Sequence, residues 1–359
     1  MNYQSWQGVD DPKFGYGSML AGFKSGIPKT VELNDQASVD VFMNVPNVKE
    51  SWLDGQHRVC FTMWETDVLP ESFVRWLPLY DQIIVPCDHN VELFSRYHDN
   101  VSKVQLGVDT KFWSGYTAPD GVFRFLAGGS LWFRKGLDVV VQAFLKLDLP
   151  DAELHIKAAP HARDTPDAKD PRVVLHRRWM DLETQKDWFK QGHVFVAPSR
   201  GEGFGLMPLQ AISLGMPTIV SDSTGHQEFS YLATGVAPTV KALAKTIGQW
   251  DEPDVDALAE LMLDHYKNWS THQAEAVVNS RGASAFTWKK AAKALLDAVP
   301  VGELLPDTVV VPAIVNFDIQ VKRKVYCNIA KTQYEFTPGE TYWVSEDVKR
   351  VLNDAGYLV

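Results

Sequence analysis

The run PSRGEGFGLMPLQA occupies residues 198–211, and the residues on either side indicate its place in a fold. The apolar stretch VFVA at 194–197 predicts a buried strand before it, and a helix follows that stops at Gly215 and Pro217. A glycine-rich turn from a strand into a helix exposes backbone N–H groups at the positive end of the helix dipole. The turn therefore suits a phosphate or a sugar hydroxyl, and Glu202 is placed to accept hydrogen bonds from two hydroxyls. A tight structural turn with a solvated glutamate is the alternative.

Short apolar stretches alternate with helix-like stretches along the chain before and around this run. We expect strands at 30–33, 39–43, 58–63, 82–85 and 102–106, and then at 122–127, 153–157, 173–176, 194–197 and 218–220. We expect helices at 16–25, 71–77, 88–97 and 137–147, with Asp88 as the N-cap of the third. The segment at 116–121 has the composition of a linker. This alternation predicts an α/β fold with two units, each a parallel sheet covered by helices.

The C-terminal part of the sequence has a different character. Helices are expected at 255–269 and 288–299, and residues 300–306 contain two prolines and a glycine that end the second one. Beyond them, strand-like stretches at 309–311, 314–324 and 334–336 and a terminal helix at 346–355 predict a small appended module rich in β-structure.

The composition excludes several classes of protein. The 359 residues carry 35 basic and 45 acidic side chains, a formal net charge of -10, and 45% of them are hydrophobic, which is typical of a folded globular protein. The acidic excess disfavours nucleic acid as the main partner. No apolar run approaches the ~18 residues that a membrane span needs, and the first residues show no signal segment. The three cysteines, Cys60, Cys87 and Cys327, lie far apart, which indicates a reducing compartment, the cytoplasm, and neither a disulfide frame nor a zinc site.

The run from 198 to 220 resembles the donor-binding segment of the family 4 (group 1) retaining glycosyltransferases, which have the GT-B architecture. Further matches occur in the expected order at FLAGG (125–129), FRKGLD (133–138), ETDVLPESFV (65–74), LGVDTKF (106–112) and FTWKKAA (286–292). The resemblance covers about residues 14–299. It implies two Rossmann-like domains facing a cleft, at 1–118 and 119–285, a closing helix at 286–303 that crosses back to the first domain, and an appendage of unknown role at 304–359.

The resemblance also implies a donor site for a nucleotide-diphosphate sugar, which is a substrate, with no separate cofactor. Arg134 and Lys135 are expected to neutralise the diphosphate, Glu202 to hold sugar hydroxyls, and Glu65 to position the acceptor hydroxyl. Donor contacts are further expected from Gly15, Gly17, Gly129, Trp179, Met180, Gly203, Phe204, Gly205, Leu206 and Gln210.

This chain departs from the family pattern at several positions. Gln210 stands where the family has the glutamate that holds the ribose, and Gly129 stands where many members have an arginine. Residues 1–6 are a weak substitute for the apolar opening strand, and Trp64 and Glu65 stand where a histidine is often found. His89, His161 and His226 are other candidates, each more often an ordinary surface or core histidine.

We therefore expect retaining hexosyl transfer without a metal, since no Asp-x-Asp pair ends a predicted strand. No second carboxylate is evident beside Glu202, so a front-face displacement is expected. A non-catalytic carbohydrate- or partner-binding protein derived from a transferase is the alternative, and an epimerase or phosphorylase of the same fold is a third. The acceptor stays open among a glycan, a protein, a lipid and a modified nucleic acid base. The appendage is a candidate surface for oligomer formation.

Overall fold

The computed structural model describes residues 1–9, 11, 15–47, 52–53, 55–129, 133–160 and 170–305, and in the tail 310–311, 316–320, 322, 325–329, 332–340, 342–345, 349–350, 352–353 and 357–358. The chain divides into two compact units, Met1–Pro46 with His57–Leu304, and Asn47–Gln56 with Leu305–Val359. The second unit thus includes Asn47–Gln56, whereas the sequence analysis expects 1–118 to be one continuous domain. His161 and most of the expected terminal helix lie outside the described residues.

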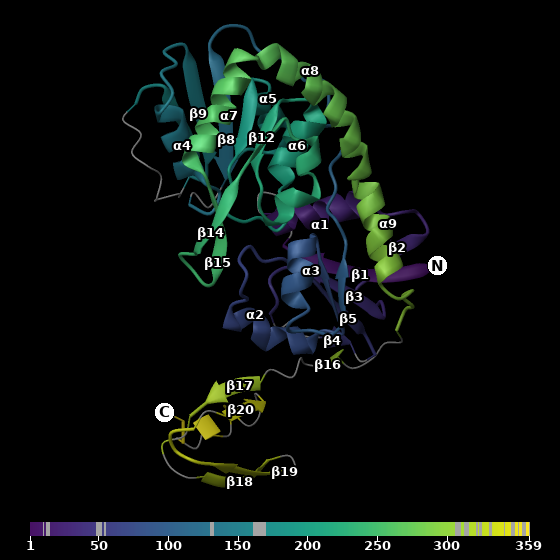
Figure 1. The fold of residues 1–359 in the computed structure, drawn as a ribbon. Coiled ribbons are helices and arrows are strands. Elements are labelled where there is room, and N and C mark those ends of the chain that lie inside the picture. Colours follow the sequence, from purple (N-terminus) through teal and green to yellow (C-terminus); the bar gives the residue numbers. More distant parts are fainter. Residues whose placement is uncertain are drawn as a thin grey trace. The chain divides into compact units, whose positions relative to one another are not determined.

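The first half of the larger unit is a six-stranded parallel sheet. Its strands are β1 (Asn2–Gly8), β2 (Val31–Leu33), β3 (Val39–Met43), β5 (His57–Phe61), β6 (Gln82–Val85) and β7 (Val101–Lys103), in the order β2-β1-β3-β5-β6-β7. Its helices are α1 (Gly15–Gly26), α2 (Glu71–Trp76) and α3 (Asp88–Phe94), with a 3-10 turn at Leu77–Leu79 (Figure 1). The cysteines Cys60 and Cys87 are unpaired and buried in this half.

The opening strand β1 corrects the expectation of a weak start. Its sequence NYQSWQG is polar, yet it lies inside the sheet between β2 and β3. Ser5 is buried, and its Oγ donates a hydrogen bond of 2.6 Å to Oδ1 of the buried Asp40 on β3. Because this cross-strand bond satisfies both polar groups, a polar segment forms a full interior strand.

The second half of the larger unit repeats the architecture. Its parallel strands are β8 (Phe123–Gly129), β9 (Ala152–Ala158), β10 (Val173–Arg177), β11 (Val194–Ala197), β12 (Thr218–Ser221) and β13 (Gly235–Ala237), in the order β10-β9-β8-β11-β12-β13. The helices among them are α4 (Leu137–Leu145), α5 (Leu182–Phe189) and α6 (Leu206–Leu214). The prediction of an α/β fold with two parallel sheets is confirmed.

The end of the larger unit connects its two halves. An antiparallel hairpin, β14 (Thr239–Leu243) and β15 (Gln249–Pro253), precedes α7 (Val255–Lys267), α8 (Trp269–Asn279) and α9 (Trp288–Ala298). Figure 1 shows α8 and α9 following one another from the second sheet to the first. There α9 packs on α1, with the rings of Trp288 and Phe23 5.6 Å apart, and Gln82 of β6 donates to the carbonyl of Ala298 at 2.9 Å. The hairpin and α8 are absent from the sequence prediction.

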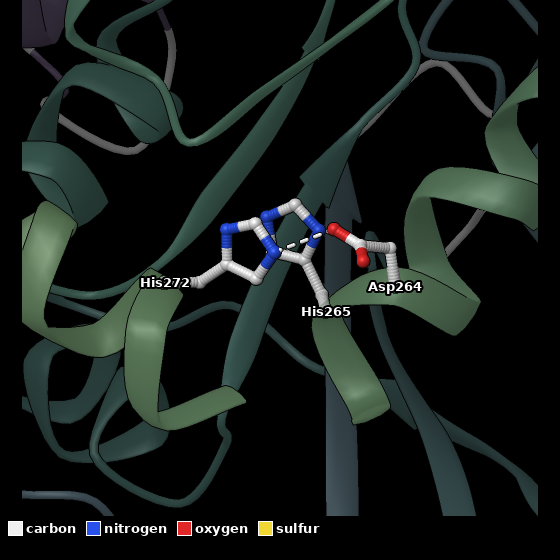
Figure 2. A group of neighbouring side chains, drawn as sticks. All are labelled: Asp264, His265 and His272. Atoms are coloured by element: carbon white, nitrogen blue, oxygen red, sulfur yellow. Dashed lines mark hydrogen bonds and ion pairs between the residues drawn. The ribbon is translucent and has the colours of Figure 1, made fainter. Parts of the chain in front are cut away.

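A polar cluster joins α7 to α8 (Figure 2). The rings of His265 and His272 are stacked with centroids 3.7 Å apart, and His272 Nε2 lies 2.7 Å from Asp264 Oδ2. Both nitrogens of His265 have partners, the carbonyl of Leu261 and the hydroxyl of Thr234. Lone pairs of imidazole nitrogens lie in the ring plane, so two parallel rings cannot direct them at one ion. The three residues lie close enough for metal binding, but their geometry fits a structural contact between helices.

The smaller unit contains three antiparallel strand pairs among its described residues. These are β16 (Val310–Val311) with β4 (Trp52–Leu53), β17 (Asn316–Ile319) with β20 (Tyr342–Ser345), and β18 (Val325–Ile329) with β19 (Thr332–Phe336). The expected β-rich appendage is confirmed, although β4 comes from a segment that was not assigned to it. No helix in the described part of the chain combines the length and apolar character of a membrane span.

Candidate functional site

A cavity of about 500 Å³ lies at the carboxyl ends of the second sheet's strands. Open parallel sheets bind ligands at this edge. First-domain residues close its other side, among them Tyr16, Met63 and Glu65. The predicted site residues that line it are Gly15, Glu65, Gly129, Arg134, Lys135, Trp179, Met180, Glu202, Gly203, Phe204, Gly205, Leu206 and Gln210. Gly17 does not line it, because the expected glycine loop is the first turn of α1 and Gly17 is buried within it.

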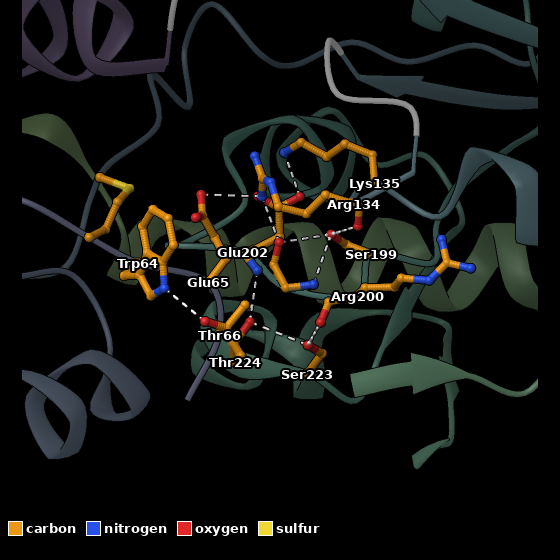
Figure 3. A network of polar contacts seen from close by, with 12 residues as sticks. Trp64, Glu65, Thr66, Arg134, Lys135, Ser199, Arg200, Glu202, Ser223 and Thr224 are labelled. Atoms are coloured by element: carbon orange, nitrogen blue, oxygen red, sulfur yellow. Dashed lines mark hydrogen bonds and ion pairs between the residues drawn. The ribbon is translucent and has the colours of Figure 1, made fainter. Parts of the chain in front are cut away.

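Four charged side chains meet in one wall of the cavity (Figure 3). Lys135 Nζ lies 2.5 Å from Glu202 Oε1, and Arg134 Nη1 lies 3.6 Å from Glu202 Oε2. The same Arg134 nitrogen lies 3.3 Å from Glu65 Oε1 and donates to the carbonyl of Gly201 at 2.6 Å. The Arg134 guanidinium therefore joins a carboxylate of the first domain, Glu65, to a carboxylate of the second, Glu202. The sequence alone does not reveal that Glu65 and Glu202 share this partner.

The local charges keep Glu202 ionised. Burial alone would raise its pKa, but Lys135 and Arg134 outweigh burial and hold the pKa of Glu202 at about 2. Burial lowers the pKa of the Lys135 ammonium, an effect that Glu202 only partly offsets. The wall thus carries two cations and two carboxylates and can exchange these internal contacts for the oxygens of a ligand.

Backbone hydrogen bonds fix the turn that carries Glu202. The N–H of Glu202 donates to Thr224 Oγ1 at 2.8 Å, and the N–H of Gly225 donates to the carbonyl of Glu202 at 3.0 Å. A side chain at Gly203 would collide with Met63 of the first domain, so this glycine permits the close approach of the two domains beside the cavity. The turn ends at Gly205, the N-cap of α6, and the first residues of this helix, Leu206 and Met207, line the cavity.

The structure explains the departure at Gly129. A Cβ at this position would lie 2.9 Å from Cβ of Lys135 and closer still to its Cγ. Gly129 therefore leaves room for the aliphatic part of Lys135, which carries the ammonium to Glu202.

Sequence reasoning missed several lining residues, among them Lys157 and Gln185. Lys157 Nζ donates to Gln185 Oε1 at 2.7 Å, and Gln185 Nε2 donates to Gln210 Oε1 at 2.7 Å. A signal existed for Lys157, because it ends a predicted strand of the second sheet, at the edge where ligands bind. No comparable signal points to Gln185, which reaches the cavity from within α5.

The two histidine candidates among the described residues, His89 and His226, do not line the cavity. His226 is fully buried, with Nδ1 3.3 Å from Ser221 Oγ, and His89 Nε2 lies 3.2 Å from the carbonyl of Thr66. Both are structural contacts of the fold.

Two Rossmann-like domains around a ligand cavity define the GT-B architecture of glycosyltransferases. Residues 123–264 match the family Glycosyl transferases group 1, which confirms the resemblance at the level of that group.

Two curated relatives and one solved structure illustrate the similarity. The chain is 28% identical over 191 residues to the lipopolysaccharide core biosynthesis mannosyltransferase LpcC of Rhizobium leguminosarum bv. viciae, covering 48% of this chain and 53% of LpcC. It is 29% identical over 155 residues to the D-inositol 3-phosphate glycosyltransferase of Arthrobacter sp. (strain FB24), covering 40% and 34%. These matches span about half or less of the relatives' lengths. HepE of Anabaena, solved with UDP and glucose, superposes with a TM-score of 0.61 at 12% identity over 83% of this chain and 98% of HepE, a likeness of fold.

Proposed function

We propose that the chain is a retaining glycosyltransferase that moves a hexose from a nucleotide-diphosphate sugar to an acceptor hydroxyl. The observation that carries this proposal is the wall where Arg134, Lys135 and Glu202 meet the start of α6. Cleavage of a sugar–diphosphate bond places negative charge on the leaving phosphate, which cations and helix N–H groups stabilise. The group 1 domain supports the same reaction class, and the complex of HepE with UDP and glucose supports a nucleoside diphosphate and a hexose.

Each lining residue has a role in this proposal. Arg134 and Lys135 bind the diphosphate, and Glu202 orients the hexose through its hydroxyls. Further donor contacts come from the α6 turn (203–206), from Gly15 and Gly129 at the phosphates, from Trp179 and Met180 at the base, and from Gln210 at the ribose.

The domain division at 118/119 belongs to the proposal. The first domain supplies the acceptor side, 286–303 crosses back to it, and 304–359 is an appendage that offers a surface for oligomer formation. The proposed compartment is the cytoplasm, because Cys60 and Cys87 are both free and buried.

The proposed mechanism is a front-face displacement without a metal. The leaving phosphate takes the proton of the acceptor hydroxyl, and the new glycosidic bond forms on the face from which the phosphate departs. Glu65 contacts Arg134 in the wall of the cavity and orients the acceptor hydroxyl.

The alternative is a binding protein derived from a transferase. It draws support from the internal pairing of Arg134 and Lys135 with carboxylates and from the amide at Gln210.

Release of free nucleotide separates the two functions. The protein is incubated with UDP-, GDP-, ADP- and dTDP-hexoses, with and without simple sugar acceptors. We expect the wild type to release nucleotide from at least one donor and Glu202→Ala to release none. The control Glu71→Ala should keep full activity, because the Glu71 side chain is 91% exposed. Nucleotide binding without release from any donor would favour the binding protein.

A further inference from the structure

Three side chains from three elements form a hydrogen-bonded chain in the lining of the cavity. Lys157 lies next to the last residue of β9, Gln185 lies in α5 and Gln210 lies in α6, and all three residues line the cavity. The two hydrogen bonds, from Lys157 Nζ to Gln185 Oε1 and from Gln185 Nε2 to Gln210 Oε1, are both 2.7 Å long.

The Lys157 ammonium determines which atoms donate and which accept in both hydrogen bonds. A protonated lysine has donors and no acceptor, so Gln185 must present its oxygen to Lys157. Its Nε2 then faces Gln210, which must in turn present its own oxygen. Among the described residues Gln210 Nε2 has no partner, so its N–H groups are left for a ligand.

The charge around Lys157 differs from that of the wall at Glu202. Arg134 and Lys135 are each paired with a carboxylate, whereas Lys157 contacts no carboxylate among the described residues. Burial lowers the pKa of Lys157 to about 8, so the group is mainly protonated at pH 7 and remains a donor. This side of the cavity therefore offers hydrogen-bond donors where a glutamate at position 210 would offer only acceptors.

We propose that Lys157 is a positioning residue that acts through Gln185 to hold the Gln210 amide with its N–H groups toward the nucleotide, so that the site recognises an acceptor oxygen there. The inference rests on the proposed function, in that the nucleotide part of the donor occupies this side of the cavity. The ligand group is an oxygen of the ribose or base that accepts a hydrogen bond from the Gln210 amide. This oxygen does not need to carry a proton that it could donate.

The test measures dissociation constants of UDP, GDP and ADP by calorimetry at pH 7 for the wild type, Lys157→Met, Gln185→Met and the double variant. We expect Lys157→Met to weaken the best nucleotide about tenfold, the effect of one hydrogen bond. We expect the double variant to bind no more weakly than Gln185→Met, because the lysine acts only through the glutamine. Lys157→Arg, which keeps donors only, should restore affinity.

Equal weakening by Lys157→Met in both backgrounds would overturn the proposal, since the lysine charge would then act directly on the ligand. Failure of the wild type to bind any of the three nucleotides would instead contradict the proposed function. In that event the free energies of unfolding of the same four proteins test the hydrogen-bonded series Lys157–Gln185–Gln210. A loss of stability in the double variant that differs from the sum of the two single losses supports the series, and additive losses overturn it.

Discussion

At the scale of single residues, the contact between Lys135 and Glu202 is the shortest of the ion pairs described in the cavity wall. The two groups lie 2.5 Å apart, and their side chains are 23% and 9% exposed. Lys135→Ala should weaken donor binding and turnover together, by about 2–4 kcal/mol in kcat/KM, because a cation at the leaving phosphate is lost. Steady-state kinetics with the best donor measure this. Lys293→Ala is the control, since that lysine is 73% exposed, and unchanged kinetics in Lys135→Ala would rule out the assignment.

Glu65 and Glu202 share the Arg134 guanidinium, and this sharing makes the role of Glu65 testable. If Glu65 only orients the acceptor, Glu65→Gln keeps the size and part of the hydrogen bonding, and measurable activity should remain. A general base would lose ~10²–10⁴-fold on the same change. The measurements are kcat for the wild type and Glu65→Gln, and the anomeric configuration of the product by NMR. A covalent glycosyl adduct on Glu65, detected by mass spectrometry, would contradict the front-face route.

At the scale of elements, the N-terminus of α3 receives its cap from the other domain. The side chain of the N-cap residue Cys87 makes no capping hydrogen bond, and the N–H of Asp88 donates to Glu228 Oε1 at 2.7 Å. Glu228 is also paired with Lys103 at 3.2 Å and is 6% exposed. The expectation that Asp88 would cap this helix is wrong, because a carboxylate 140 residues away in sequence occupies that place.

We expect Glu228→Ala to lower the free energy of unfolding by about 1–3 kcal/mol, since it removes both a helix cap and a partly buried ion pair. Urea unfolding followed by circular dichroism measures the loss. Glu228→Gln keeps an acceptor for the Asp88 N–H and should recover part of it. Equal stability of the wild type and Glu228→Ala would show that the two domains do not depend on this contact.

The limits of sequence prediction follow the same division between local and distant contacts. The strand at 194–197 and the turn into α6 were predictable, because the apolar run and the glycines determine them locally. The charged wall was partly predictable from the order of motifs. The chain through Gln185 was not, since it depends on how α5 packs beside β9. The hairpin β14–β15 was missed because β14 is largely exposed and β15 buries the adjacent residues Trp250 and Asp251, which gives no apolar alternation along β15.

At the scale of the whole molecule, two buried histidines make stability depend on pH. Burial lowers the pKa of His226 and of His265 from 6.5 to about 4. Between these values the unfolded chain binds more protons than the folded one, so stability falls as pH decreases from 6.5 toward 4. At pH 5 each histidine should cost about 2 kcal/mol relative to pH 7. Denaturant unfolding at both pH values should show this difference, and His226→Phe should remove about half of it. A stability that is equal at pH 7 and pH 5 would contradict the argument.

The distribution of charge over the cavity also predicts independence from divalent metals. Three carboxylates line it among the described residues, Glu65, Asp181 and Glu202. Glu65 and Glu202 are bound by cations, and Asp181 caps α5 by accepting a 2.8 Å bond from the N–H of Thr184. Each of the three carboxylates thus already has a protein partner, while Arg134, Lys135 and the start of α6 supply positive charge where the leaving phosphate develops its negative charge. Transfer activity should therefore be unchanged by excess EDTA, measured as nucleotide release before and after dialysis against the chelator. Complete loss of activity that manganese restores would show that the cations of the wall are insufficient and that a metal joins them at the diphosphate.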